Sequence, residues 1–325
     1  MSKFNSRTII EVFTLLCLWI LLVTVTVLSV TRTITDTGDN SYMLIRNSKG
    51  HYWDPISSNI QVAIDDLGAN GGTVWIGSAI TITSPIKPKN FVQIDFLGNK
   101  VSLGADINFL NVTACQYATV KNAYVYLSEY QTAPVILLYI PNGGDGWTNR
   151  IDYNTFDNIN IIHHDSHWIS GWGFREHNFT GIKLEINTGR MVYNTFSNIK
   201  MNGGSIGIHL ENLNTSSGFG NGNYFENIWI DSFVTGVEFD AIGVGYNENV
   251  FEDVKTQTVG YSIDGFKGIS GNGNQFMNCL IWDWSATVNT NGHEWSISNT
   301  ANNTVILAHY MTTDILNNGH NTKIL

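Results

Sequence analysis

The sequence predicts an all-β protein folded as a parallel β-helix, a solenoid in which short strands stack coil upon coil. Gly is frequent at 31 of 325 residues, Pro is scarce at 5, and Asn makes up about one residue in nine, which is typical of strands joined by tight turns. Only 14% of the residues are charged, while 43% are hydrophobic and can form a core. Two short phrases that recur in constant order from residue 154 onward supply the coil repeat.

The composition also excludes several classes of protein. With 12% aromatic residues the chain is too hydrophobic to be disordered. Helical bundles use Ala, Glu, Lys and Leu, whereas this chain favours Asn, Gly, Ile, Val, Thr and Phe. The formal net charge is −10 and basic residues form no cluster, so we expect no nucleic-acid partner.

An apolar run near the amino terminus predicts export. Residues 12–30 are long enough to cross a ~30 Å hydrocarbon core as a helix, and Lys3 and Arg7 favour a cytoplasmic amino terminus. A cleaved signal peptide, which would release a secreted protein, and a pilin-type leader with Glu11 are the alternatives. We expect a cytoplasmic tail at 1–8, a transmembrane helix or signal sequence at 9–31, a linker at 32–50, and a β-helix domain outside the cytoplasm at 51–325.

The first phrase combines Asn, Phe and a second Asn or Asp with alternating apolar residues. Phe156 and its equivalents are predicted to point inward, and Asn158 and its equivalents to take a bend, since Asn tolerates left-handed φ. Stacked coils would then place Phe on Phe and Asn on Asn, giving an apolar column and an amide ladder. The phrase starts at Asn154, Asn194, Asn223, Asn249 and Asn274, with spacings of 40, 29, 26 and 25 residues.

The second phrase opens with Gly and ends in a carboxylate, and it alternates with the first. It occupies residues 181–185, 207–211, 236–240 and 260–264. A coil of about 25 residues with two or three short strands indicates a parallel β-helix, whereas a β-propeller blade needs ~40–45 residues for four strands.

A short amphipathic helix is expected ahead of the coils, where it would close the apolar end of the solenoid. Ser57 or Ser58 can serve as its N-cap, and Gly68 ends it. The apolar side chains on one face of this helix are Ile56, Ile60, Ala63, Ile64 and Leu67.

Residues 60–77 read Ile-Gln-Val-Ala-Ile-Asp-Asp-Leu-Gly-Ala-Asn-Gly-Gly-Thr-Val-Trp-Ile-Gly. This stretch resembles the opening of the pectate-lyase-like (pectin-lyase-fold) superfamily, in which a capping helix leads into the first coil. The resemblance covers residues 51–325 and implies a right-handed parallel β-helix. The N-T-D, D-D, G-H and R-I-K phrases of the galacturonan hydrolases have no counterpart here, and the calcium aspartates of the uronate lyases cannot be placed.

The superfamily resemblance leaves the function open, because it includes both enzymes and non-catalytic surface proteins. We expect an exported, membrane-anchored protein that binds a polysaccharide or surface glycan and, as an enzyme, would cleave it as a lyase or glycoside hydrolase. The alternative is a non-catalytic surface adhesin or a spike on a virion or cell. Trimeric spikes share this architecture, so a homotrimer is compatible with the sequence.

The second phrase carries the candidate chemistry. If Ile182 and Leu184 point inward, alternate residues point outward and form two columns. The first column contains Lys183, His209, Glu238 and Ser262, and the second contains Glu185, Glu211, Asp240 and Asp264.

Stacking at ~4.8 Å would bring neighbouring carboxylates together. Glu185, Glu211 and Asp240 are therefore candidate catalytic acids and bases, assisted by His209 and Lys183. The same three carboxylates with Asp264 are candidate ligands of Ca²⁺, the one cofactor that the pattern suggests. A solvated row of strand-end acids without a chemical role is the alternative.

The repeat is interrupted by an insertion at 163–177 that is rich in His and Trp. Loops over a lateral face of a solenoid often carry function, so we expect glycan contacts here. A transition-metal site made by the four His, or a packed loop with solvated His, are alternatives. The predicted contact residues are Trp168, Trp172, Arg175 and Glu176, with Trp229 extending the surface two coils along.

Two further expectations concern covalent chemistry. Cys115 and Cys279 fall several coils apart, beyond the ~7 Å limit between Cα atoms, so we expect no disulfide. Asn-x-Ser/Thr sequons predict glycosylation at Asn111, Asn178, Asn214 and Asn302.

Overall fold

The computed structural model describes residues 44–141, 149–163, 178–213, 218–241, 245–258, 264–283, 295–308 and 315–325. Ile45–Leu325 forms one compact unit, made mainly of parallel strands with one short α-helix in its described part. The predicted all-β class with parallel strands is confirmed. Among the described helices none is long and apolar enough to span a membrane; the segments predicted at 1–8 and 9–31 lie outside the described residues.

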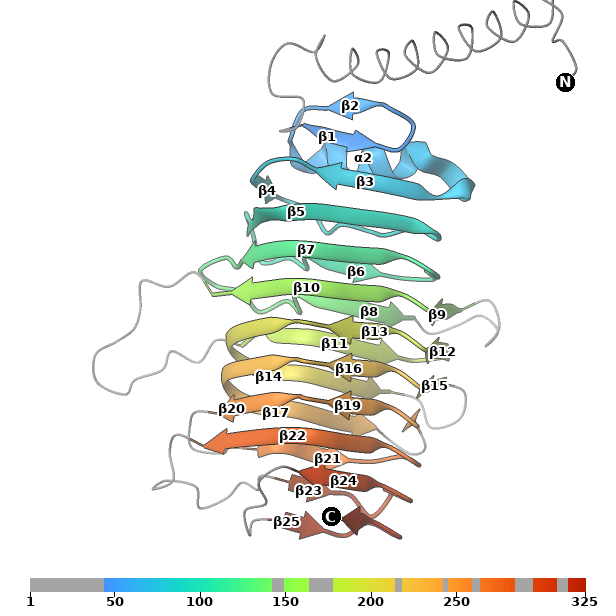
Figure 1. Ribbon diagram of the computed structural model, residues 1–325, viewed down its shortest axis with the longest axis vertical. Coiled ribbons are helices and arrows are strands. Elements are labelled where there is room, and N and C mark those ends of the chain that lie inside the picture. The colour runs from blue at the N-terminus through green and yellow to red at the C-terminus, as the bar shows by residue number, and fades with distance from the viewer. Residues whose placement is uncertain are drawn as a thin grey trace, which may run out of the picture. The chain divides into compact units, whose positions relative to one another are not determined.

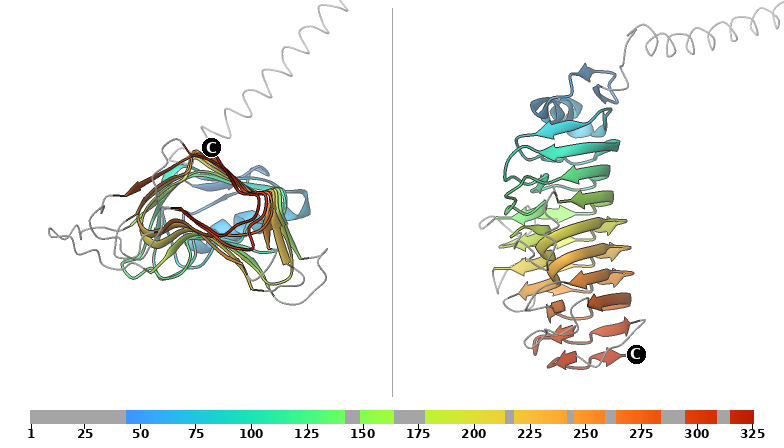
Figure 2. Two further views of the ribbon diagram at one scale, coloured as in Figure 1. Left: turned by 90° about the horizontal axis from the view of Figure 1, so that it is seen from below. Right: turned by 90° about the vertical axis from the view of Figure 1, so that its left-hand side faces the viewer.

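The strands of this unit lie in columns, and successive turns of the chain add strands to the first and second columns, as Figures 1 and 2 show. Parallel registers run from β3 to β26 in the first column and from β6 to β25 in the second. Four shorter strands make a third column. Two long strands, β14 (Lys200–Asn212) and β17 (Trp229–Ala241), run through the first and second columns.

The other strands of the first column are β3 (Gly72–Ile76), β4 (Ile80–Ile82), β5 (Val92–Leu103), β7 (Thr119–Tyr126), β10 (Thr155–Ile162), β13 (Thr195–Ser197), β16 (Tyr224–Glu226), β19 (Val250–Glu252), β20 (Lys255–Thr258), β22 (Gln275–Asp283), β24 (Val305–Ala308) and β26 (Lys323–Ile324). Those of the second are β6 (Leu110–Val112), β8 (Ile136–Ile140), β11 (Thr180–Ile186), β21 (Asp264–Ile269), β23 (Trp295–Ile297) and β25 (Ile315–Asn317). The third consists of β9 (Arg150–Asp152), β12 (Gly189–Val192), β15 (Gly218–Asn221) and β18 (Tyr246–Asn247).

A column of phenylalanines runs through the core, as the first phrase predicts. Neighbouring rings lie 4.6–4.9 Å apart between centroids, with interplanar angles of 16° or less. Each such pair adds about 0.5–1.5 kcal/mol to the stabilisation from burial alone. The column contains Phe156, Phe196, Phe225, Phe251 and Phe276, all buried.

The predicted bend is also confirmed. The residue two places after each of these phenylalanines has a φ between 50° and 54°, in the left-handed region that Asn and Asp tolerate best. Their side chains form a discontinuous outer ladder: Asn227 donates to Asn198 at 2.8 Å and Asn158 to Asn122 at 2.9 Å, but Asn198 donates to Asp157. The bend residues are Asn158, Asn198, Asn227, Asp253 and Asn278.

A second, buried ladder is formed by the Asn that opens each phrase, and the sequence did not predict its position. The amide Nδ2 of each of the first four donates to the Oδ1 of the next coil at 2.9–3.1 Å and also to a backbone carbonyl, whereas Asn274 Nδ2 donates to two backbone carbonyls. The Oδ1 of each of the last four accepts in addition the backbone N–H of the preceding Asn, and Asn154 Oδ1 accepts the Ala118 N–H. The five side chains, which are at most 1% exposed, are Asn154, Asn194, Asn223, Asn249 and Asn274.

The Gly of the second phrase is needed for packing. A Cβ at Gly181 would lie 2.5 Å from the Met201 sulfur, and one at Gly207 would lie 2.5 Å from the Ile230 side chain. These positions mark the corner where the first column packs against the second, so only Gly leaves room for the apolar side chain.

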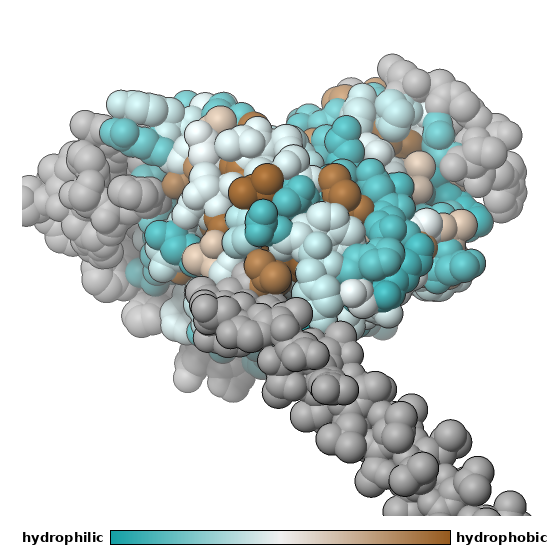
Figure 3. Space-filling model, turned by 90° about the horizontal axis from the view of Figure 1, so that it is seen from above, coloured by the Kyte–Doolittle hydropathy of each residue, from teal (hydrophilic) through white to brown (hydrophobic). Residues whose placement is uncertain are grey.

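The amino-terminal end of the unit is closed by a helix, as predicted. Helix α2 (Ser57–Leu67) buries four of the five predicted apolar residues, whereas Ile56 is 54% exposed because it precedes the helix. The predicted serine N-cap is wrong, since Ser57 Oγ accepts the Thr83 N–H at 3.0 Å instead. Seen from above, this end shows mostly hydrophilic and near-neutral residues with scattered apolar ones (Figure 3).

The predicted start of the domain at residue 51 is too late. Strand β1 (Ile45–Asn47) lies within the expected linker at 32–50 and pairs antiparallel with β3 and with β2 (Tyr52–Trp53). It adds a strand beside the first coil, so the compact unit begins at Ile45.

Outside the core, an exposed aromatic stack spans four successive coils. Its neighbouring rings lie 5.1–5.3 Å apart, and every one of its residues has a φ between 56° and 62°. In a neighbouring coil Gly222 takes the same conformation under the Tyr193 ring. The stack contains Phe91, Tyr117, Tyr153 and Tyr193, each 45–54% exposed.

Candidate functional site

The registers of β11, β14 and β17 bring together the charged residues of the second phrase. Lys183 is paired with His209, which is paired with Glu238, and the neighbouring column joins Glu185, Glu211 and Asp240. Both predicted columns are therefore confirmed over these three coils.

The fourth member of the carboxylate column was assigned wrongly. Asp264 is paired with Thr235, and Lys267 takes the place next to Glu238. The fourth copy of the second phrase starts at Gly265 rather than Gly260, because Phe266 is the residue paired with Val237. Asp264 is thus displaced along the strand, and the predicted Ca²⁺ set of four carboxylates does not assemble. Ser262 lies outside the described residues.

Lys183 links two carboxylates of adjacent coils. Its Nζ lies 2.9 Å from Glu185 Oε2 and 2.8 Å from Glu211 Oε2, and all three side chains are less than 20% exposed. The two carboxylates raise the pKa of Lys183, although burial of the ammonium opposes them as the largest single effect. The ammonium thereby offsets the repulsion between Glu185 and Glu211.

Glu238 is held by a separate ion pair with Lys267, at 2.7 Å between Oε1 and Nζ. This pair is one coil beyond His209 in the same column. The Lys267 ammonium therefore offsets the charge of the Glu238 carboxylate, which neighbours His209 in the same column.

His209 is the most enclosed member of this charged cluster, with 9% of its surface exposed. Burial lowers the pKa of its imidazole, and the carboxylates of Glu238 and Glu211 oppose that shift. Its Nε2 is buried and has no hydrogen-bond partner in the described part of the chain. Ligand atoms of His209, Glu211 and Asp240 all lie within 4.8 Å of one another.

This arrangement disfavours the predicted acid–base roles of Glu185 and Glu211. A glycosidase pair needs one carboxyl group that is protonated and one that is free to attack or to activate water. Here a single ammonium contacts both groups, so neither is left without an ion-pair partner. The cluster is better suited to binding a cation or a polar ligand than to proton transfer.

A second candidate site is a groove of about 310 Å³ on the outer side of the first column. Trp229 is 44% exposed, so its predicted outward orientation is confirmed. The Lys200 ammonium lies 6.0 Å from the Trp229 ring centroid, and Asn202 Nδ2 donates to Asp231 Oδ2 at 3.4 Å. Its lining residues are Asn160, Ile161, Ile162, Lys200, Met201, Asn202, Trp229 and Asp231.

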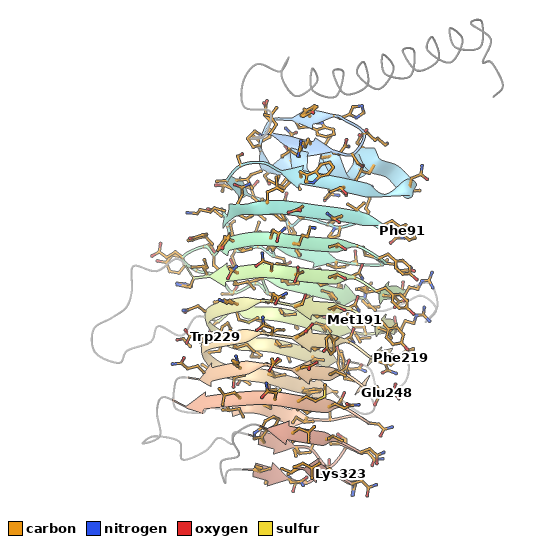
Figure 4. The ribbon with its side chains drawn as sticks, viewed as in Figure 1. Phe91, Met191, Phe219, Trp229, Glu248 and Lys323 are labelled. Atoms are coloured by element: carbon orange, nitrogen blue, oxygen red, sulfur yellow. The ribbon has the colours of Figure 1, made fainter. Side chains whose placement is uncertain are left out.

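Sequence reasoning identified Trp229 in this groove but not its polar neighbours. A usable signal was present, since Asn160, Lys200 and Trp229 occupy the same outward position of the first phrase in successive coils. Asn202 and Asp231 are paired two residues further along. In Figure 4 Trp229 lies on one side of the coils, opposite Phe91, Phe219 and Glu248.

Most residues predicted in the insertion lie outside the described residues. The chain leaves the groove at Ile162, the end of β10, and returns at Thr180, the start of β11 beside the charged cluster. The insertion therefore joins the two candidate sites along the chain. Trp168, Trp172, Arg175 and Glu176 belong to the part not described.

The covalent predictions are partly tested. Cys115 and Cys279 are both free and buried, which confirms the absence of a disulfide between them. Among the sequons, Asn178 and Asn302 are exposed, whereas Asn111 lies within β6 with its Oδ1 buried. Asn214 lies outside the described residues.

No protein-family model matches the chain, and no curated protein matches it either.

Proposed function

We propose that this protein is an exported, membrane-anchored, right-handed parallel β-helix of the pectate-lyase-like kind that binds a polysaccharide or surface glycan. The Trp229 groove is the observation that carries the proposal. In-register coils give an elongated outer surface, along which a chain molecule can make repeated contacts. The apolar run before the domain supports export and anchoring.

The groove has the chemical character of a carbohydrate subsite. The half-exposed indole of Trp229 offers an apolar face to a sugar ring. Amides of Asn160 and Asn202 and the carboxylate of Asp231 offer donors and acceptors for hydroxyl groups. A small number of polar groups around an apolar surface is the usual composition of a ligand site.

Binding without cleavage is the form of this function that we favour, as in a surface adhesin or spike. The ion pairs from Lys183 to Glu185 and Glu211 support it, because they occupy the carboxylates that would act as acid and base. The groove itself offers one carboxylate, Asp231, rather than a pair.

The experiment is titration of the full-length protein with a panel of neutral and uronate polysaccharides, followed by calorimetry. Trp229→Ala should weaken binding roughly three- to tenfold, the loss expected for one aromatic contact. Phe219→Ala is the matched control, since Phe219 is 38% exposed on the opposite side of the coils.

Two results would contradict the proposal. If no polysaccharide binds, or if the two variants lose affinity equally, the groove is not the subsite. New reducing ends, or the ultraviolet absorbance of an unsaturated uronate, would show cleavage and exclude the non-catalytic form.

A further inference from the structure

We propose that His209, Glu211 and Asp240 form a binding site for a borderline divalent metal ion of the Zn²⁺ type, independent of carbohydrate binding. The three residues come from two adjacent strands, β14 and β17, whose register is fixed by ten paired positions. Their ligand atoms lie within 4.8 Å of one another. Zinc requires ~2.0–2.2 Å to each ligand atom, so the three side chains would have to rotate toward a common centre to bind it.

The buried imidazole is the observation that points to a ligand. His209 is 9% exposed, and its Nε2 has no hydrogen-bond partner among the residues that the structure describes, although charged groups surround it. A buried polar atom without a partner costs about 1–3 kcal/mol, so native proteins rarely keep one without a reason. A metal ion bound through Nε2 would satisfy this nitrogen and remove that cost.

The local charge also matches a divalent cation. Glu185, Glu211 and Asp240 supply three negative charges, and Lys183 supplies one positive charge, which leaves two negative charges. Glu238 does not change this balance, since Lys267 neutralises it. A divalent ion at Glu211 and Asp240 would bring the cluster to zero.

The ligand set selects the class of metal. One imidazole nitrogen with two carboxylates suits Zn²⁺ and its neighbours, whereas Ca²⁺ prefers six to eight oxygen ligands. Asp240 is exposed, so the remaining coordination position opens to solvent. Water or an oxygen of a ligand can occupy that position.

Lys183 can keep an ion-pair partner when the metal ion binds. It contacts both Glu185 and Glu211, so it keeps the first carboxylate when the second turns to the metal. The ammonium thus gives up its contact with Glu211 and remains paired with Glu185.

The test uses full-length protein stripped with a chelator and equilibrated separately with Zn²⁺, Co²⁺ or Ca²⁺. We expect the wild type to bind one equivalent of Zn²⁺ or Co²⁺ that His209→Gln and Asp240→Asn both lack. The visible absorbance of Co²⁺ should show nitrogen and oxygen ligands and should disappear in His209→Gln. Glu238→Gln is the matched control and should retain the metal, since Glu238 neighbours His209 without belonging to the site.

Several outcomes would overturn the proposal. Equal metal content in wild type, His209→Gln and Asp240→Asn would place any bound ion elsewhere among the nine histidines. Binding of Ca²⁺ in preference to Zn²⁺ would exclude the imidazole as a ligand. Glu211→Gln provides a third variant where one of the others fails to fold, and retention of the metal in it would equally contradict the site.

Discussion

The amides of the buried Asn ladder are the residues on which the stacking of coils depends most directly. Asn223 Oδ1 accepts two hydrogen bonds, from the backbone and the side chain of Asn194. Its Nδ2 donates to Asn249 Oδ1 and to the Met191 carbonyl. Four buried contacts therefore pass through one side chain that is 0% exposed.

Removal of this amide should be strongly destabilising. We expect Asn223→Ala to lower the free energy of unfolding by about 3–5 kcal/mol, because several buried donors and acceptors lose their partner. Asn227→Gly is the control: it removes one exposed bond from the outer ladder at a φ of 50° that Gly adopts freely. Urea titration compares the two, and equal losses would show that the buried ladder has no special weight.

At this scale the sequence predicted the bend residues but not the buried ladder. The bend at Asn158 follows from local preference, since Asn tolerates left-handed φ. The burial of Asn154 depends on partners 39 and 40 residues away, which no local pattern shows. Tyr117, Tyr153 and Tyr193 also have a left-handed φ, which Tyr rarely adopts. The exposed aromatic stack therefore could not be predicted from local preference either.

Among the elements, β18 is tied to the charged strands through the core. The phenol of Tyr246 is fully buried and donates to the carbonyls of Leu184 in β11, at 2.7 Å, and Glu211 in β14, at 3.1 Å. The phenol thereby links the third column to the candidate metal site.

This phenol should make the fold sensitive to alkali. Burial raises the pKa of Tyr246 well above 10, and the Glu211 and Glu185 carboxylates raise it further. The folded state therefore holds the proton while the unfolded chain releases it, so stability is intact below about pH 10 and falls as the pH rises further. Tyr246→Phe should cost about 1–2 kcal/mol at pH 7, yet lose less stability between pH 9 and 11.

Denaturant titrations of both proteins across that pH range measure the effect. The buried thiols also lose protons on unfolding in alkali, but they are the same in both proteins and cancel in the difference. Parallel curves for the two proteins would show that Tyr246 does not titrate on unfolding.

The sequence predicted elements well where the repeat is regular. It placed the capping helix and the columns through Asp240, because Gly, apolar residue and charge recur at fixed spacing. The prediction was wrong at Asp264. Residues 260–264 match the pattern of the second phrase, but residues 265–267 occupy its register beside β17. The groove was missed because its lining comes from three coils, and only Trp229 is conspicuous in one of them.

Across the whole molecule, each coil contacts mainly the coil before and the coil after it, so local opening should differ along the stack. At one end α2 buries Ile60, Ile64 and Leu67. At the other, Leu316 is 41% and Leu325 is 73% exposed. Among the described residues, the coils near Leu316 therefore show more exposed apolar surface than those beside α2.

Two buried thiols report on this difference. Burial raises the pKa of both Cys115 and Cys279 to about 12, so neither reacts unless its coil opens. We expect Cys279, in β22, to label faster than Cys115 in mild urea. Full-length proteins with Cys17 and one of the two thiols replaced by Ser allow each rate to be measured with a chromogenic disulfide. Identical rates would mean that the entire unit opens in one step.

The coil spacing has a practical consequence. The buried Asn side chains lie in hydrogen-bond contact whether the coil between them has 40, 29, 26 or 25 residues. Differences in coil length therefore lie in the connections between strands, and the hydrogen bonds of the ladder are kept. An epitope or enzyme fused between β10 and β11, where the longest coil already carries its extra residues, would be displayed without altering the scaffold. The protein could in this respect serve as a display scaffold, with one insertion position in each coil.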